Sequence, residues 1–473
     1  METPITDTGA MAPTTTELSP YGWFATLWPV AVLFHLAGND FNLLSLTTVG
    51  FLQIPFLFAA IAMLLRPSPA MALLLAGTHV PVVIAKLPVV GNHEVLLLLM
   101  HIAVILAVAT RGKDWLAAVV PPLRWVLLIA YSAIAFSKLN SSFVDRSVSC
   151  AVVFADELGD WVNVSVSGSA ALSAMVIAGV LVTEISIPIM LMTRRLRRFG
   201  VVVGLCFHTL LALEPVGHVL DFTSVLFVLF CLFLTPPTSA ALSTAINRVK
   251  QSAGTTRIAA LLVVMVGGNI VTYRLRVAGY DAPRWLFDYP FFLAYAGFML
   301  CTVTPATRRQ PTAPKLALRT APAMAVVVLL TSLNAVSPYV ELRTAGAFNM
   351  YSNLMVDDGR TNHFLLPGTL PLRDAPNLYA YTAEPGSRIG LDVYDQAGLV
   401  IPEANLAQWA NIFPDLDVAA QLVRGDGAPT TIGVQDLAAD VNASDSLIER
   451  IAYIRAIDAE GPTSCLRYWG AAH

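Results

Sequence analysis

Charged side chains are scarce in this sequence. Only 13% of the 473 residues are Asp, Glu, Lys or Arg, whereas 56% are hydrophobic and the mean hydropathy is +0.65. A soluble domain averages about 25% charged residues, so this deficit excludes a soluble enzyme, a disordered chain and a nucleic-acid-binding protein. The sequence contains instead a series of apolar runs of about 17 to 25 residues, each long enough to cross a hydrocarbon core of roughly 30 Å. We therefore predict an integral membrane protein embedded in a lipid bilayer.

Lysine, cysteine and recognisable ligand motifs are also rare. Five of the 29 basic residues are lysines, a preference for arginine that is typical of a GC-rich bacterial genome, and the chain contains five cysteines. None of the cysteines has metal-ligand spacing, and no helical His or Glu pair has the H-E-x-x-H or E-x-x-H pattern. We therefore predict no metal. The first 65 residues contain neither Lys nor Arg, so we expect the first apolar run to be a span rather than a signal peptide.

The apolar runs predict an all-α polytopic bundle of about eleven transmembrane helices, because backbone groups in lipid must be satisfied within each segment. Residues 1–21 form a short N-terminal tail, 22–337 the membrane domain and 338–473 a more polar C-terminal domain. The expected spans are 22–38, 47–65, 69–90, 94–110, 117–139, 168–192, 199–214, 218–236, 258–273, 287–305 and 320–337.

Loop charges predict the orientation of the bundle in the cell membrane. The loops after even-numbered spans hold most of the cations, among them Arg66, Arg111 and Lys113, the arginines of 194–198, and the basic residues of 248–257 and 308–319. The positive-inside rule places these loops in the cytoplasm. We therefore expect a cytoplasmic N-terminus, and the odd number of spans places the C-terminal domain outside the cell.

The C-terminal domain differs from the membrane domain in charge and pattern. Residues 341–473 carry a net charge of -9 and residues 1–340 one of +6, which together give the chain's -3. Gly and Pro separate short segments in this domain, which predicts a small extracytoplasmic α+β domain. The strand-like runs are 364–366, 378–382, 389–394 and 430–434, and the helix-like stretches lie near 403–423 and 444–456.

Two cysteines are expected on the outer side. Cys150 follows the fifth span and Cys465 lies in the C-terminal domain, while the other three cysteines lie within predicted spans. An oxidising compartment favours a disulfide between Cys150 and Cys465. The alternative is a pair of unrelated free thiols.

Ionisable residues inside spans are functional candidates because burying their charge in lipid is costly. Lys138 ends the fifth span and shares one helix face with Tyr131. A lysine partly desolvated at the outer boundary can supply a neutral amine as a base, although a lysine at a helix end often only snorkels to the interface. His93 lies in a short outer turn on the same side, either as a partner of this site or as a solvated loop histidine.

Two further ionisable residues are expected to meet inside the bundle. Glu184 and His208 lie on the helices that flank the arginine-rich 194–198 loop. At 1.5 Å per residue, both lie roughly 12–14 Å from the cytoplasmic end. Their equal depth predicts an ion pair or hydrogen bond, with a structural role or, alternatively, a role in proton relay.

Four short motifs together resemble one membrane-protein family. They are Asn92-His93, the stretch from Tyr131 to Leu139 that contains Lys138, Phe207-His208, and Met350-Tyr-Ser-Asn-Leu354 followed by Asn362-His363. In order and topology, residues 22–370 are similar to the HTTM superfamily, which comprises the membrane domain of the vitamin K-dependent gamma-carboxylases and their bacterial relatives.

The resemblance implies a lyase-type reaction at the outer membrane face. In the carboxylases a lysine deprotonates reduced vitamin K, the quinol reacts with O2, and the resulting base removes a glutamate proton so that CO2 adds. By this resemblance Lys138 is the base, His93 is a second catalytic residue, and Tyr131, His208 and His363 support the site. Glu184, the expected partner of His208, is a further supporting residue. The implied cofactor is reduced vitamin K or menaquinone, with O2 and CO2 as co-substrates. A secreted peptide or envelope protein is the implied substrate.

Two other functions stay open at the level of sequence. The first is a non-catalytic membrane partner or maturation factor for a secreted peptide or envelope complex, with the acidic domain as its docking surface. The second is a transporter, which the lack of a clear internal repeat or of paired Gly/Pro-broken helices disfavours.

Overall fold

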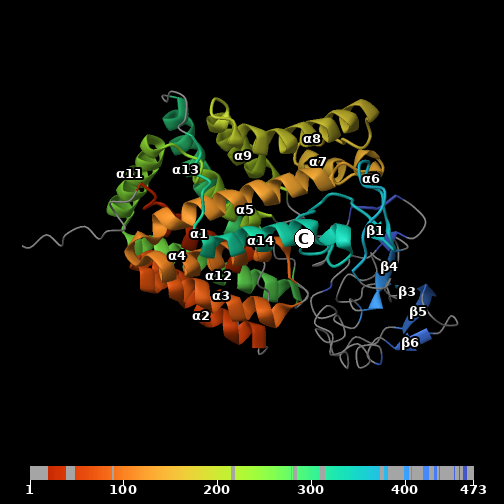
Figure 1. Ribbon diagram of the computed structural model, residues 1–473, viewed down its shortest axis with the longest axis horizontal. Coiled ribbons are helices and arrows are strands. Elements are labelled where there is room, and N and C mark those ends of the chain that lie inside the picture. Colours follow the sequence, from red (N-terminus) through yellow and green to blue (C-terminus); the bar gives the residue numbers. More distant parts are fainter. Residues whose placement is uncertain are drawn as a thin grey trace, which may run out of the picture.

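The structure, a computed structural model, is a helical bundle with a small sheet region at one end (Figure 1). It describes residues 20–38, 48–87, 90–214, 219–277, 280, 285–308 and 315–372, followed by short pieces between residues 378 and 465. Seven stretches of the described residues are long and apolar enough to cross a membrane, and one of them, Asn92–Ser137, contains both α4 and α5. The chain is therefore a helical membrane protein.

Each predicted span overlaps one helix. Two of these helices, α1 and α10, are apolar but shorter than the seven membrane-spanning stretches. The helices that overlap the predicted spans are α1 Phe24–Gly38, α2 Thr48–Leu65, α3 Pro69–Lys86, α4 Asn92–Arg111, α5 Trp115–Ser137, α8 Ala170–Met192, α9 Arg197–Ala212, α10 Leu220–Cys231, α12 Thr255–Val277, α13 Trp285–Arg308 and α14 Pro322–Val336.

Three helices were not predicted because they lie in segments that hydropathy assigns to loops. They are α6 Ser141–Val144, α7 Cys150–Asp160 and α11 Pro236–Ala253. Their ends carry ordinary local signals: the Asn140 side chain accepts a hydrogen bond from Phe143 N–H at the start of α6, and Pro236 occupies the first turn of α11. Both are standard helix N-terminal features.

Helices α1 and α10 pack against each other and form the interior of the bundle. Every residue of α10 is buried, as is nearly every residue of α1. A helix that is apolar on all sides is expected to be enclosed by other helices. By contrast, α8 exposes a lipid-type surface that includes Met175, Val182 and Ile189.

After α14 the chain forms a short 3-10 helix, η2 Ser337–Val340, and then an irregular segment and strands. Strands β1 Val356–Asp357 and β2 Arg360–Thr361 form an antiparallel pair. A five-stranded antiparallel sheet follows, in the order β6-β5-β3-β4-β7. It contains β3 Leu378–Tyr381, β4 Leu399–Pro402, β5 Ala419–Arg424, β6 Thr431–Gly433 and β7 Ile457–Asp458. Figure 1 shows these strands beyond the end of the bundle where α5 and α14 finish.

The strand predictions for the tail are partly right. The predicted strands 378–382 and 430–434 correspond to β3 and β6. The predicted strand 364–366 is wrong, because this segment is bent and its Phe364 N–H donates to the Leu139 carbonyl just after α5 instead of to a strand. The predicted helix 403–423 is wrong at its C-terminal end, where β5 pairs with β3 and β6. The predicted strand 389–394 and nearly all of the predicted helix 444–456 lie outside the described residues.

Candidate functional site

Lys138 and His93 lie at the same end of the bundle. Helix α4 begins at Asn92, α5 ends at Ser137, and the two helices pack against each other. Residues 341–354, which we call the cover segment, contact both helix ends. Arg343 donates to the Val90 carbonyl next to α4, and Lys138 donates to the Met350 carbonyl at 3.0 Å. The cover segment therefore joins the two predicted site residues to one end of the bundle.

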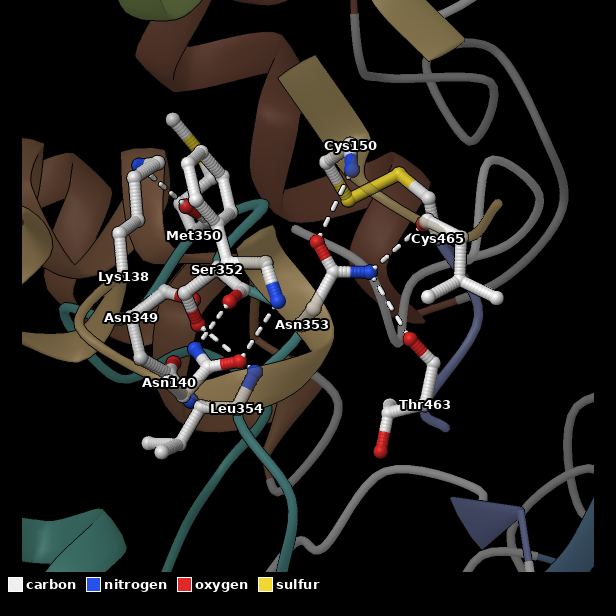
Figure 2. The surroundings of a disulfide bond; sticks show 12 residues. Lys138, Asn140, Cys150, Asn349, Met350, Ser352, Asn353, Leu354, Thr463 and Cys465 are labelled. Atoms are coloured by element: carbon white, nitrogen blue, oxygen red, sulfur yellow. Dashed lines mark hydrogen bonds between the residues drawn. A yellow bond between two sulfur atoms is a disulfide. The ribbon is translucent and has the colours of Figure 1, made fainter. Parts of the chain in front are cut away.

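Lys138 is buried, and its amine has a defined set of neighbours. The residue is 4% exposed, so it does not snorkel to solvent. Its Nζ lies 2.9 Å from Glu184 Oε2 of α8 and 5.9 Å from the centre of the Phe143 ring. Figure 2 shows the amine directed at the Met350 carbonyl. A carboxylate, a carbonyl oxygen and an aromatic ring thus lie next to a buried basic group.

The predicted pair between Glu184 and His208 is corrected by these contacts. Glu184 pairs with Lys138, and His208 Nε2 lies 2.9 Å from the Tyr131 hydroxyl. The argument from equal depth considered only α8 and α9. Helix α5 packs against α8 and presents Tyr131 and Lys138, two turns apart, so the two buried groups each find a partner on this third helix.

His363 holds the end of α5. The last carbonyl groups of a helix have no partner within the helix. Here His363 Nε2 lies 2.9 Å from the Phe136 carbonyl, and Phe364 N–H donates to the Leu139 carbonyl at 2.9 Å. The imidazole also packs on the Phe136 ring, with 4.3 Å between ring centres. His363 therefore positions the turn that carries Lys138.

Two asparagine side chains attach the cover segment to the helices. Asn140 donates to the Ser352 carbonyl at 2.6 Å. Asn353 accepts a hydrogen bond from Cys150 N–H and donates to the carbonyl groups of Val148 and Thr463, each at 2.9 Å. Figure 2 shows Asn353 beside the sulfur bridge.

The predicted disulfide is confirmed. Cys150 at the start of α7 is bonded to Cys465 across a sequence separation of 315, with Cα atoms 4.9 Å apart. Together with the Asn353 contacts, the bridge fixes the end of the described tail beside the cover segment.

His93 belongs to a second buried group. Its Nε2 lies 3.6 Å from Asp221 Oδ2 of α10, and His35 Nδ1 of α1 lies 3.6 Å from the same oxygen. His93 is only 6% exposed, so it is not a solvated loop histidine. Glu94 Oε1 lies 4.0 Å from His35 Nε2 and also contacts the amine of Lys86.

Sequence reasoning missed His35, Asp221, Glu94 and Lys86 as members of one group. Their signal was only that each is an ionisable residue within or at the end of an apolar run. No spacing along the chain links them, because they come from α1, α3, α4 and α10.

Tyr351 lies in the cover segment beside the site of Lys138. It follows Met350, which accepts the Lys138 hydrogen bond. Burial raises the pKa of the Tyr351 phenol, and the negative charges of Glu214 and Asp221 raise it further.

The chain was compared with family models, curated proteins and solved structures. No family model, no curated protein and no solved structure matches it.

Proposed function

We propose that this chain is a membrane-embedded enzyme that acts on a lipid quinol, with Lys138 as the base. The observation that carries the proposal is the contact between Lys138 and Glu184 inside the bundle. Burial of an ion pair is costly, and an ionisable group inside a membrane span is by default a functional candidate. The resemblance of four short motifs to the HTTM superfamily suggests the chemical class, because these motifs contain Tyr131, Lys138 and His208 in the order expected for that family.

The residues around the amine are of the types that bind a quinol, namely an aromatic ring and a basic group. Phe143 offers an aromatic face 5.9 Å from Nζ, and the exclusion of water strengthens charge effects at the site. A reduced quinone, such as vitamin K or menaquinone, supplies an acidic hydroxyl and reducing electrons when bound. Lys138 would lie against that hydroxyl, and Phe143 beside the ring.

The proton chemistry follows from the 2.9 Å contact between Lys138 Nζ and Glu184 Oε2. When the proton of the pair lies on Glu184, Nζ has a free lone pair. Nζ then accepts the hydroxyl proton, the O–H bond breaks, and the new ammonium stabilises the negative charge left on the substrate oxygen. Tyr131 lies on the same face of α5 as Lys138, and its hydroxyl lies 2.9 Å from His208 Nε2 of α9. These two side chains make this face of α5 polar. The resemblance adds O2 and CO2 as co-substrates and a glutamate of a secreted peptide or envelope protein as the acceptor.

We place the Lys138 end of the bundle outside the cell. The disulfide between Cys150 and Cys465 supports this orientation, because disulfides persist in oxidising compartments. The arginines of 194–198 are typical of a cytoplasmic loop. Alkaline phosphatase fused to the C-terminus should be active in intact cells. A fluorescent C-terminal fusion protein together with an inactive phosphatase fusion would show that the C-terminus is cytoplasmic and contradict this orientation.

The test of function is turnover by the purified full-length protein with reduced menaquinone. Quinol oxidation is followed by ultraviolet absorbance, and ¹⁴C-bicarbonate incorporation into glutamate-containing peptides is measured in parallel. Lys138→Met should abolish both signals. The matched control is Lys250→Met, because Lys250 is also partly buried and hydrogen-bonded, to Thr26 at 2.7 Å, but lies on α11. Full turnover in Lys138→Met would exclude the mechanism. A stable stoichiometric protein partner, with no turnover and no extractable quinone, would support a non-catalytic partner function.

A further inference from the structure

We infer that His35, His93 and Asp221 form a binding site for a divalent first-row transition metal ion inside the bundle. One ligand atom from each of these residues lies within 4.8 Å of the other two, and all three residues are buried. The site goes beyond the proposed quinol chemistry and requires no participation of Lys138.

The distances fit a shared metal ion. Ligands at about 2.1 Å from a tetrahedral ion lie about 3.4 Å from one another. Asp221 Oδ2 lies 3.6 Å from His35 Nδ1 and 3.6 Å from His93 Nε2. An ion placed between these three atoms therefore requires side-chain movements of only a few tenths of an ångström.

The donor set selects the class of metal. Two imidazole nitrogens and one carboxylate suit Zn²⁺, Fe²⁺ and related ions, whereas Mg²⁺ and Ca²⁺ prefer oxygen ligands. The ligands come from three different helices, α1, α4 and α10. A set of three protein ligands leaves coordination positions open for water or substrate, as in catalytic metal sites.

A carboxylate lies near the ligands, where it could orient one of the two imidazole rings. A metal-bound histidine usually presents its other ring nitrogen to a carboxylate or carbonyl group. If His35 binds through Nδ1, its Nε2 faces Glu94 Oε1 at 4.0 Å. Glu94 is in turn held by the Lys86 amine and by Gly91 N–H, which lies 3.2 Å from Oε2.

The charges of the buried group leave room for a cation but do not select it. Asp221 and Glu94 contribute two negative charges and Lys86 contributes one positive charge, so the net charge is -1. An uncompensated charge inside a membrane protein is costly. A divalent ion changes this net charge to +1 and protonation of one histidine brings it to zero, and the experiment must separate these two states.

Further imidazoles extend from this site into the bundle. The His35 ring centre lies 5.5 Å from that of His93 and 6.0 Å from that of His79, and His79 lies 4.6 Å from His101. Within the described part of the chain, neither ring nitrogen of His79 has a hydrogen-bond partner, although the residue is 0% exposed. A fully buried polar ring without partners indicates an interior built for more than packing.

The experiment uses the full-length protein purified in detergent. Its metal content is measured by inductively coupled plasma mass spectrometry, and the apo protein is titrated with Zn²⁺ and with Co²⁺, whose visible spectrum reports ligation. We expect about one saturable site per chain. Asp221→Asn and His93→Gln should each weaken binding by more than about 100-fold, because loss of a group that only orients a ligand already costs about 10- to 100-fold.

The control is His208→Gln, which removes a buried histidine that is bonded to Tyr131 and should leave metal binding unchanged. Non-reducing electrophoresis of the Cys150–Cys465 bridge checks that each variant folds. The proposal would be overturned if the wild-type protein held no metal and showed no saturable binding of Co²⁺ or Zn²⁺. A protonated histidine would then supply the compensating positive charge. Equal binding by folded His93→Gln and Asp221→Asn would also overturn the proposal. Both outcomes are independent of quinol turnover, so the two proposals fail separately.

Discussion

The side chain of Asn353 accepts a hydrogen bond from the backbone N–H of Cys150 at 2.9 Å, 203 residues away in the sequence. The same amide donates to two carbonyl groups, and the residue adopts a left-handed backbone conformation with φ 53°. Asn tolerates this conformation better than most residues. One side chain therefore couples the cover segment, the start of α7 and the end of the described tail.

Asn353→Asp should destabilise the protein and loosen the cover segment. Aspartate keeps the shape and still accepts from Cys150, but a carboxylate cannot donate to the Val148 and Thr463 carbonyl groups. Leaving buried partners unsatisfied costs about 1–3 kcal/mol each, so the melting temperature in detergent should fall clearly. Asn163→Asp is the matched control, because Asn163 also has a positive φ, of 54°, but is exposed. Equal melting temperatures for both variants would contradict this role.

Cys465→Ser should lower the melting temperature without abolishing folding of the bundle. Removal of a disulfide typically costs about 2–4 kcal/mol, and the large helical core does not depend on the tail. Peptide mapping of the wild type should recover Cys150 and Cys465 in one linked fragment only without reductant. Cys206→Ser serves as the control because Cys206 is free and exposed. Two alkylatable thiols at positions 150 and 465 in unreduced protein would refute the bridge.

Glu184→Gln should destabilise the protein more than loss of the whole pair does. The single substitution leaves the Lys138 ammonium buried without its counter-charge, which costs about 3–5 kcal/mol, whereas replacing both members by neutral groups is often tolerated. Thermal melts of Glu184→Gln, Lys138→Met and the double variant therefore give a coupling energy. Additive effects of the two substitutions would show that the pair contributes nothing to stability.

Hydropathy predicted a helical membrane body, and every expected span overlaps a helix. The eleven expected spans compare with seven stretches of the described residues that are long and apolar enough to cross a membrane, one of which contains two helices. Hydropathy missed α11, since that helix is polar and amphipathic rather than apolar. In the tail, the strand β5 falls within a predicted helix. There the pairing of β5 with β3 and β6 decides the structure, and tertiary pairing of this kind overrides local propensity.

Of the candidate sites, the disulfide could be predicted from the sequence, whereas the contacts between helices could not. The disulfide followed from compartment and topology, which the sequence encodes through loop charges. The partner of Glu184 could not be predicted from the sequence, because it depends on how α5 packs against α8. Depth along a helix does not determine which neighbouring helix a side chain faces. The group of His35, His93 and Asp221 was inaccessible for the same reason: each of the three helices contributes one ligand, and no sequence spacing links the three residues.

His363 should make stability depend on pH. Burial lowers the pKa of this imidazole, and its neutral form accepts a hydrogen bond from Leu365 N–H on Nδ1 at 3.1 Å. A histidine with a folded-state pKa below its unfolded value stabilises the fold above the unfolded pKa, and this contribution is lost as pH falls through the folded pKa. The melting temperature should therefore drop between pH 7.5 and pH 5. His363→Gln should reduce that drop, and an identical pH profile in the variant would assign the effect to other groups.

Gly91→Ala should impair the metal site without removing any ligand. A Cβ atom at position 91 would lie 2.4 Å from His93 Cε1 and 2.9 Å from Nδ1, so the imidazole must rotate away from Asp221. We expect Zn²⁺ affinity to fall by about tenfold or more, as it does when a residue that orients a metal ligand is replaced. Competition with a chromogenic chelator measures this change. Gly77→Ala on α3 is the matched control, because nothing lies within 4 Å of its added methyl group. Unchanged affinity in Gly91→Ala would mean that the orientation of His93 does not determine metal binding.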